Sequence, residues 1–571
     1  MSGGGTISPT DPGGPPEVFD SRSPKSSPTG VGKAIGGSGR FLDNRMGGSA
    51  FFRESLNKVF PDNWSFMIGE IALYSFVILL LTGTYLTLFF HDSTQQVIYH
   101  GSYTRLQDVS MSDAYASTLN ISFDVRAGLV IRQIHHWAAL LFIAGMVVHA
   151  SRVFFTGAFR KPREINWLIG VGLMALGIGE GFAGYSLPDD LLSGTGLRIA
   201  YSIALSIPVV GTWAGYLVFG GPYPGTSIIP RLYVIHILLI PGIILALITA
   251  HLGILWHQKH TQFPGPGKTE NNVVGERMFP VYSAKAGGFF MIVFAMLAAL
   301  GGLAQINPIW LYGPYDPSNV SAGSQPDWYV GFLDGAVRIM PNWEFRGFGH
   351  TIPFMLLVPG AVIPGLMFAA FALYPFLEAR FTGDHAYHNL LQRPRDAPTR
   401  AGCGMMALTF YSVMWASGGN DVMSSIFHVS LNALTWAGRI LLIIAPPIAY
   451  KVTKLICIQL KRKEDEQIHH GYETGVVRRL PSGEYIEVHA PLPAAHQPVL
   501  TPVETTTFAQ LTNGTRAANG SHGANGSNGA NGSNGANGAN GSKKELLPVG
   551  SGADQPDRSE HRGGILGFFR P

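Results

Sequence analysis

The sequence predicts an all-α membrane protein with eight transmembrane helices, four of them bundled in the N-terminal half, and with disordered polar tails. Of its 571 residues, 46% are hydrophobic and only 13% are charged, and the mean hydropathy is +0.19. Soluble domains carry about 25% charged residues, so this composition favours lipid as the surrounding solvent. The chain has no basic patch interleaved with aromatic residues, and we therefore expect no nucleic-acid partner.

Eight apolar segments are long enough to cross a bilayer core, which needs about 20 helical residues. The expected spans are Phe66–Phe90, Gly128–Phe155, Trp167–Leu187, Leu232–His257, Ala286–Leu303, Ile352–Leu377, Met405–Ile426 and Leu431–Leu455. Basic residues gather in the loops that follow the even-numbered spans. The positive-inside rule therefore predicts a multi-pass protein of the cell membrane with both termini in the cytoplasm.

Composition also divides the chain into segments. Residues 1–50 are rich in Gly, Pro and Ser, and Asn519–Ser542 repeats Asn-Gly with Ser and Ala. Segments of this kind bury too little apolar surface to offset the entropy of ordering. We therefore expect a disordered segment at 1–50, a four-helix bundle at 51–260, a C-terminal four-helix membrane part at 261–460, and a cytoplasmic, largely disordered tail at 461–571.

Two of the expected spans each carry two histidines about four helical turns apart. His135 and His149 on the second span are fourteen residues apart, and His236 and His251 on the fourth are fifteen apart. These separations correspond to about 21 Å and 22 Å of helix, and each pair lies on nearly one face. Both helices run from outside to inside. His135 therefore faces His236 near the outer leaflet, and His149 faces His251 near the inner leaflet.

Paired imidazoles at matched depths indicate two non-covalent b-type hemes, each with two axial histidines. A lone histidine in a span is more often a hydrogen-bonded packing residue, but four at matched depths are difficult to explain in that way. His136 breaks the pattern and is interpreted as a neighbouring packing or polar residue. The chain has two cysteines and no Cys-x-x-Cys-His, so we expect no covalent c-type heme and no four-cysteine iron–sulfur cluster.

Glycine spacing supports this diheme bundle. The first span contains Gly69 and Gly83, and the third contains Gly170 and Gly184, each pair fourteen residues apart. A helix approaches a flat porphyrin closely only where a side chain is missing, although glycine is also a common packing residue in membrane helices.

Three arginines near the ends of the spans are candidates to bind the heme propionates. Arg132 and Arg231 lie just before the outer histidines, and Arg152 lies three residues beyond His149. The planar guanidinium group matches a carboxylate. Arg152 fits a positive-inside residue equally well.

These residues resemble those of cytochrome b from the bc-type quinol oxidoreductases, over roughly residues 45–460. The segment Pro326-Asp327-Trp328-Tyr329 resembles the Pro-Glu-Trp-Tyr motif of the family's outer quinol-oxidation site, with Asp in place of Glu. Gly-Tyr-Ser-Leu-Pro at 184–188 resembles the end of the family's third helix, which borders the same site. The spacing of the fourth-span histidines resembles the plastid and Gram-positive branches. The long tails, the eight spans in one chain and Leu390–Asp396 resemble actinobacterial members.

The resemblance implies a quinol–cytochrome-c reductase subunit with menaquinol as substrate. Quinol would be oxidised at an outer site, with one electron passing to a Rieske cluster and the other through the two b hemes. Quinone would be reduced at an inner site, which adds to the proton motive force. The implied partners are a Rieske iron–sulfur subunit, a diheme cytochrome c subunit, a cytochrome oxidase in a supercomplex, and a second copy in a homodimer.

Quinol oxidation releases protons, so the outer site needs a proton acceptor. Asp327 is the candidate, with Tyr329 as a hydrogen-bonding phenol. Asp334 lies two helical turns farther along and is expected to share the pocket, while Pro326 and Trp328 are expected to contact the quinone. A solvated loop carboxylate or a helix cap is the alternative interpretation of Asp327.

The inner site is less well specified. His257, six residues after His251, fits a partner of a quinone carbonyl or an interface residue. The mitochondrial branch opens its fifth span with Lys-Asp, but here Lys285 is followed by Ala286, which leaves the inner proton donor unassigned. The same branch has a Trp after Leu-Pro where this chain has Asp189, so the rim of the outer pocket is expected to differ.

Two other classes of protein fit part of the pattern. A heme b anchor or a transmembrane reductase subunit of another oxidoreductase would share the histidines. A reductase would need a nucleotide-binding domain, however, and no Gly-x-Gly-x-x-Gly follows a strand pattern. A transporter would typically show internal repeats and interrupted helices, which we do not find.

Overall fold

The computed structural model describes residues 41, 45, 53–223, 225–319, 325–347 and 349–491. Within these residues, seven helices are long and apolar enough to cross a membrane. They are Trp64–Leu86, Gly128–Thr156, Glu164–Tyr185, Ile228–Gln258, Met278–Leu303, Phe354–Thr382 and Leu431–His470. The predicted helical membrane fold is thus confirmed. The predictions for 1–50 and for the tail beyond residue 491 concern residues outside the described ones, apart from 41 and 45.

The expected span at Met405–Ile426 is where sequence and structure differ. It is divided into α16 (Pro398–Gly418) and α17 (Asn420–Phe427), and neither is among the seven candidate spans. The small and polar residues at 417–420 interrupt the apolar run and end α16. α16 nevertheless packs along α18 (Leu431–His470) and beside α13 (Gly331–Ile339).

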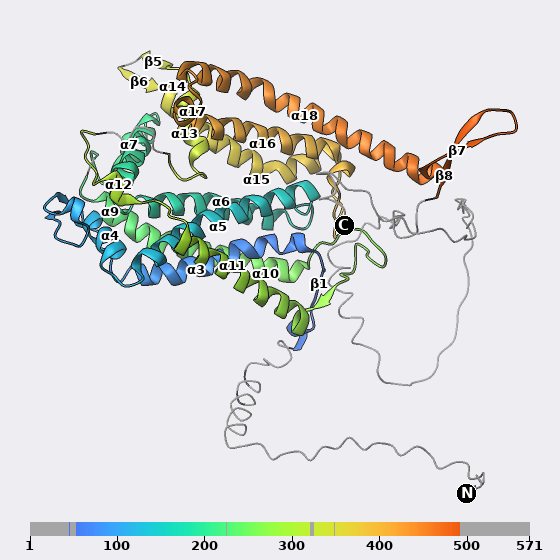
Figure 1. Cartoon of the computed structure of the whole chain (residues 1–571), viewed down its shortest axis with the longest axis horizontal. Coiled ribbons are helices and arrows are strands. Elements are labelled where there is room, and N and C mark those ends of the chain that lie inside the picture. The colour runs from blue at the N-terminus through green and yellow to red at the C-terminus, as the bar shows by residue number, and fades with distance from the viewer. Residues whose placement is uncertain are drawn as a thin grey trace, which may run out of the picture.

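A first group of helices forms the N-terminal bundle. Figure 1 shows these helices side by side, with α11 packed against α3 and α5, and α6 packed against α10. Their bounds are α3 (Ile68–Leu86), α5 (Gly128–Thr156), α6 (Glu164–Tyr185), α9 (Ile228–Val234), α10 (Ile240–Gln258) and α11 (Ser283–Leu303). The core of the bundle includes Phe76, Phe142, Leu173 and Ile244, one from each of the four long helices.

The fourth span is continuous but not uniformly α-helical. A π-helical turn, η3 (Ile235–Leu239), joins α9 to α10 and contains His236. Pro241 follows it in the first turn of α10 and has no N–H to donate. A wide turn of this kind satisfies the backbone where an α-helical bond is missing, and such turns are frequent at functional sites.

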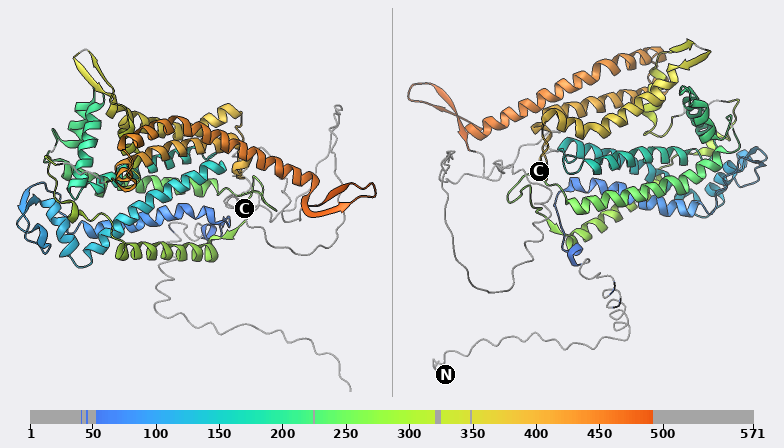
Figure 2. Two further views of the ribbon diagram at one scale, coloured as in Figure 1. Left: turned by 45° about the horizontal axis from the view of Figure 1, so that its top comes forward. Right: turned by 180° about the vertical axis from the view of Figure 1, so that it is seen from behind.

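A second group of helices covers one side of the first, and both views in Figure 2 keep the two groups in separate layers. α15 packs against α6, and α16 packs against α5. The sixth span consists of α14 (Phe354–Leu357), the π-helical turn η5 (Val358–Val362) and α15 (Ile363–Thr382).

α18 extends beyond the other helices and carries a hairpin of β7 (Tyr472–Arg479) and β8 (Tyr485–Ala490) (Figure 1). Residues 461–490, assigned to a largely disordered tail from the sequence, therefore contain the end of a helix and two paired strands.

Short elements close the two ends of the helical layers. We call the end that holds Asp327 the outer end and the end that holds Arg160 the inner end, after the orientation predicted from the basic loops. The outer end carries β2 (Gln96–Ile98), η2 (Thr104–Leu106), β3 (Ser110–Ser112), α4 (Asp113–Phe123), α7 (Leu191–Ser206), α8 (Gly211–Phe219), α12 (Ile309–Tyr312), β5 (Glu344–Gly347) and β6 (His350–Pro353). The inner end carries β1 (Val59–Phe60), η1 (Trp64–Phe66), β4 (Glu276–Arg277), η4 (Met278–Tyr282) and η6 (Pro394–Asp396).

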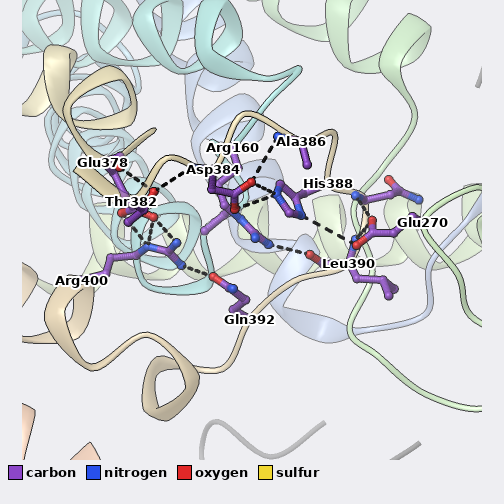
Figure 3. Close-up of polar contacts among 12 residues, drawn as sticks. Arg160, Glu270, Glu378, Thr382, Asp384, Ala386, His388, Leu390, Gln392 and Arg400 are labelled. Carbon is purple, nitrogen blue, oxygen red and sulfur yellow. Dashed lines mark hydrogen bonds and ion pairs between the residues drawn. The ribbon is translucent and has the colours of Figure 1, made fainter. Parts of the chain in front are cut away.

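A polar network at the inner end holds the loop between α15 and α16 against the first group (Figure 3). Glu270 accepts hydrogen bonds from the backbone N–H groups of Asn389 and Leu390, the latter at 2.8 Å, and Asp384 lies 3.0 Å from His388 Nε2. Burial opposes ionisation of Glu270, but the bonds from His388 and the two backbone N–H groups outweigh it and lower its pKa. The loop is thereby fixed by a charged carboxylate.

The second part of this network is a buried ion pair between two helices of the second group, α15 and α16. Arg400 on α16 is 5% exposed and pairs with Glu378 on α15, with 2.9 Å between Nε and Oε2. Its Nη1 also donates to Gln392 at 2.8 Å (Figure 3). Removing one partner of a buried pair typically costs about 3–5 kcal/mol because the other charge is left uncompensated. The pair therefore fixes α15, α16 and the loop to one another.

Candidate functional site

The outer histidines meet between α5 and the π-helical turn η3. The ring centroids of His135 and His236 are 6.1 Å apart, and the rings are nearly perpendicular. His135 Nδ1 lies 2.9 Å from Thr82 Oγ1, and His236 Nδ1 lies 2.9 Å from Glu180 Oε1. Contacts of this kind at one ring nitrogen orient the other toward a metal. With metal–nitrogen bonds of about 2 Å, one iron fits between the two rings.

The inner histidines have unused bonding capacity. The Nδ1 atoms of His149 and His251 are buried and have no hydrogen-bond partner among the described residues. Buried polar atoms are almost always paired, so an orphaned pair at one depth calls for a ligand. Phe76 and Phe142, with ring centroids 5.7 Å apart, fill the core between this level and the outer one. The residues present therefore fit two metal-centred groups stacked along the bundle.

Each of the four predicted glycines faces one of the four histidines. A Cβ atom built on each glycine would approach the ring of its partner: Gly69 and His149 at 3.0 Å, Gly83 and His135 at 3.2 Å, Gly170 and His251 at 3.7 Å, and Gly184 and His236 at 2.3 Å. The glycines of α3 and α6 thus flank the histidines of α5 and of the fourth span at both levels. The helices come close there because no side chain intervenes.

Gly184→Ala should weaken the outer heme site specifically. The new Cβ would overlap the ring of His236 at 2.3 Å and push it away from His135. Loss of ligand orientation typically costs about 10–100-fold in metal affinity. Heme content per purified chain should fall, whereas Gly179→Ala on the same helix meets nothing within 4 Å and should leave it unchanged. An equal loss in both variants would mean that alanine disturbs α6 itself.

The three arginines differ in what they can offer a propionate. Arg132 donates to the carbonyl of Asn307 at 3.1 Å but keeps a buried Nε without a partner. Arg152 lies 4.2 Å over the ring of Phe66 and keeps buried Nε and Nη2 atoms without partners among the described residues. Arg231 instead donates from Nη1 to two backbone carbonyls of α8. Arg132 and Arg152 therefore have donors to spare, whereas Arg231 binds the protein backbone.

Asp327 lies among largely buried polar side chains at the outer end. Its Oδ1 is 2.9 Å from His136 Nε2, and Tyr329 donates its hydroxyl to Oδ2 at 3.1 Å. The side chains of Asp327 and His136 are 15% and 13% exposed, so a solvated loop carboxylate is the wrong interpretation. Asp327 does not cap α13 either, because Val330 is the N-cap residue. Tyr329 is buried against Gly181, where a Cβ would lie 2.4 Å from the hydroxyl.

Of the two roles expected for His136, packing or polar, the structure shows the polar one. Its ring is turned toward the loop before α13 and bonds to Asp327. The sequence interpretation missed Glu180 and Tyr185 on α6, although Glu180 bonds to His236 and Tyr185 has a buried hydroxyl without a partner among the described residues. The available signal was their position, since polar groups inside a span are functional candidates by default.

Asp334 belongs to a different contact set. It bonds to Arg338 at 2.8 Å, and Arg338 also bonds to Asp421 on α17 at 2.8 Å. Burial raises the pKa of Asp334, and its partner Arg338 works against that shift. Among the described contacts, Asp334 therefore ties α13 to α17 and does not reach Asp327.

The other residues of the motif pack beside Asp327. The Trp328 ring lies edge-on to Tyr329, with centroids 6.0 Å apart, and its carbonyl accepts a hydrogen bond from Trp415 at 3.0 Å. Pro326 lies beside Asp327 in the described segment before α13.

Two adjacent acidic residues, Asp189 and Asp190, which we call the acidic rim, lie between α6 and α7 at the outer end. Asp190 caps α7 by accepting hydrogen bonds from the N–H groups of Leu192 and Ser193. Its neighbour Asp189 has a left-handed backbone with φ of 55°, and burial raises its pKa to about 6. A carboxyl group with this pKa changes charge close to physiological pH.

Two histidines near the end of α10 differ in burial at the inner end. His257 is exposed at the end of α10, whereas His260 packs its ring on Phe60, with centroids 4.6 Å apart. The Nδ1 atom of His260 is buried without a hydrogen-bond partner among the described residues. Lys285 is directed outward to Asp62, at 3.1 Å.

Comparisons with known proteins agree on one family. A family described as cytochrome b(N-terminal)/b6/petB matches residues 140–314. The cytochrome bc1 complex cytochrome b subunit of Mycobacterium bovis is 57% identical over 82% of this chain and 85% of the relative, and that of Streptomyces coelicolor is 55% identical over 79% and 83%. A solved chain titled hyperthermophilic respiratory Complex III has the same fold, with a TM-score of 0.56 and 20% identity over 74% of this chain and 99% of that one.

Proposed function

Because this chain belongs to the family of cytochrome b subunits of the cytochrome bc1 complex, we propose that it oxidises menaquinol at the outer end and reduces quinone at the inner end. The family assigns it to a quinol–cytochrome-c oxidoreductase of the respiratory chain and to heme b as cofactor. Two sites on opposite ends of one bundle allow proton release and proton uptake on opposite sides of the membrane.

The four histidines and their four facing glycines are the single observation that carries this proposal. His135 and His236 would hold one heme, and His149 and His251 the other. When bound, the hemes supply one-electron transfer across the bundle. The chain orients the outer rings through Thr82, Glu180 and the π-helical turn that carries His236.

At the outer end, Asp327 takes the proton of the quinol hydroxyl. Its two oxygens are held by His136 and Tyr329, which fixes the carboxylate in the pocket. Burial raises the pKa of Tyr329 well above its ordinary value, so the phenol stays protonated and remains a donor. The acidic rim at Asp189 and Asp190 offers the next acceptors on the way out.

The same proposal also implies partner subunits. Electrons that leave the outer site need a Rieske subunit and a diheme cytochrome c subunit as acceptors, and we extend the proposal to a homodimer and to a supercomplex with a cytochrome oxidase. The basic loops support cytoplasmic termini and hence an inner end on the cytoplasmic side.

The test is purification of the intact complex through this chain, followed by a reduced-minus-oxidised spectrum and identification of the subunits. We expect two b-type hemes per chain, together with iron–sulfur and c-type partners and quinol:cytochrome c turnover. Heme without such partners or turnover would favour a heme anchor of another oxidoreductase. Recovery of the chain without any heme would overturn the proposal.

A further inference from the structure

A carboxylate with two phenol partners lies at the inner end, between α3 and the start of α11. Glu70 is in the first turn of α3, and Tyr74 follows it by one turn. The Tyr74 hydroxyl lies 2.7 Å from Glu70 Oε2, and the Tyr282 hydroxyl bonds to Glu70 Oε1. The function described above uses none of these three groups.

The bonds around Glu70 accommodate both of its protonation states. The Tyr74 hydroxyl has one proton but two acceptors in reach, because it also lies 3.0 Å from the backbone carbonyl of Ala286. When Glu70 is charged, Tyr74 can donate to it. When Glu70 is protonated, it can donate to Tyr74, which then donates to Ala286. A carboxyl group that is satisfied in both states can give and regain a proton without rebuilding its surroundings.

The position of Glu70 places it beside the inner histidine level. It follows Gly69, whose missing side chain faces the ring of His149 at 3.0 Å from the ideal Cβ position. The neighbouring position on α11 has no acid to offer, since residue 286 is alanine and Lys285 pairs with Asp62 and Glu276 near solvent. Glu70 is therefore placed to meet a molecule that takes electrons at this level.

An aromatic wall and a second polar group lie next to this carboxylate. Phe60 stacks on Tyr282, with centroids 4.4 Å apart and rings 20° from parallel, and it also contacts His260, with centroids 4.6 Å apart. The buried Nδ1 of His260 has no partner among the described residues. Burial lowers the pKa of His260 to about 3, so its ring is neutral at physiological pH. A quinone has a flat ring with a carbonyl at each end, and the partners it needs are an aromatic neighbour and two polar groups of this kind.

We propose that Glu70 is the proton donor for quinone reduction at the inner end, relayed by Tyr74 and Tyr282, with His260 as partner of the second quinone carbonyl. This inference rests on the proposed function. Quinone takes up two electrons and two protons to become quinol, with the electrons arriving through the chain. Glu70 gives its proton to the quinone oxygen that faces it, is left as a carboxylate, and regains a proton from water at the inner end. The second proton reaches the oxygen beside His260 from water at the same end.

The test uses Glu70→Gln in the intact complex, with Asp327→Asn in both variant and reference to close the outer route. Hemes reduced beforehand are mixed with a short-chain naphthoquinone, and their re-oxidation is followed by stopped flow. Positioned acid catalysis contributes about 10²–10⁴-fold, so re-oxidation should slow by about 100-fold or more. Glu70→Asp should recover part of the rate, and Glu54→Gln, an exposed glutamate at the same end, should leave it unchanged.

Heme content is measured on every variant, which separates the possible outcomes. Normal heme content with unchanged re-oxidation in Glu70→Gln would overturn the role of Glu70 and leave the proposed function standing. Absence of heme from the parent complex would instead defeat the proposed function. A re-oxidation rate that still falls with rising pH in Glu70→Gln as it does in the reference would also count against Glu70, because deprotonation of the proton donor should cause that fall.

Discussion

Replacing His149 with leucine is expected to remove the inner heme and leave the outer one in place. Leucine cannot coordinate iron, and His251 alone offers one imidazole where two are needed for a six-coordinate center. The outer pair has its own supports at Thr82 and Glu180. Heme content should therefore fall by about half, and a redox titration should lose one of its two steps.

The turnover of the same variant should fall by at least about 10–100-fold. That is the usual cost of losing a contact that only orients a metal ligand, and here the ligand itself is lost. His100→Leu is the matched control, because that side chain is 73% exposed and is remote in sequence from the paired histidines. Two intact iron centers in His149→Leu would mean that the four imidazoles are not the ligands.

Asp327→Asn should slow quinol oxidation by about 10²–10⁴-fold, the usual contribution of a positioned general base. The amide keeps the shape of the carboxylate and can still bond to His136 and Tyr329, but it does not take a proton. Heme reduction by menaquinol, followed by stopped flow, measures the effect, and heme content should stay constant.

The comparison variants for Asp327 keep the fold and change one property each. Asp327→Glu retains a proton acceptor and should retain most of the rate. Asp316→Asn changes an exposed carboxylate of an outer loop and should have no effect. Undiminished quinol:cytochrome c turnover in Asp327→Asn would remove this residue from the proton path.

Helical periodicity predicts the spans and the pairing of glycines with histidines because both depend only on distance along regular helices. Two residues fourteen apart on a helix lie on nearly the same face and at two known depths in the membrane, whichever helix packs beside them. The structure accordingly brings Gly69 to His149 and Gly83 to His135. The seventh expected span differs because the glycines and polar residues near 418 break the helix within an otherwise apolar run.

Contacts between segments far apart in the chain could not be predicted in this way. The grouping of Asp334 with Asp327 assumed that one helix contains both residues. Because α13 begins at Gly331, a spacing of seven residues does not place the two side chains on one helical face. His136 and Glu70 have partners about two hundred residues away, Asp327 and Tyr282 respectively. Only packing of the helices decides such pairs.

The π-helical turn that contains His236 accounts for the difference in spacing between the two histidine pairs, fourteen residues on α5 and fifteen on the fourth span. A wide turn holds one residue more than an α-helical turn, so fifteen residues on the fourth span rise about as far as fourteen on α5. The π-helical turn accommodates the additional residue, so each histidine of the fourth span stays at the depth of its partner on α5. The number of residues between the two histidines can thus differ between the two helices, while the distance between the two metal levels stays the same.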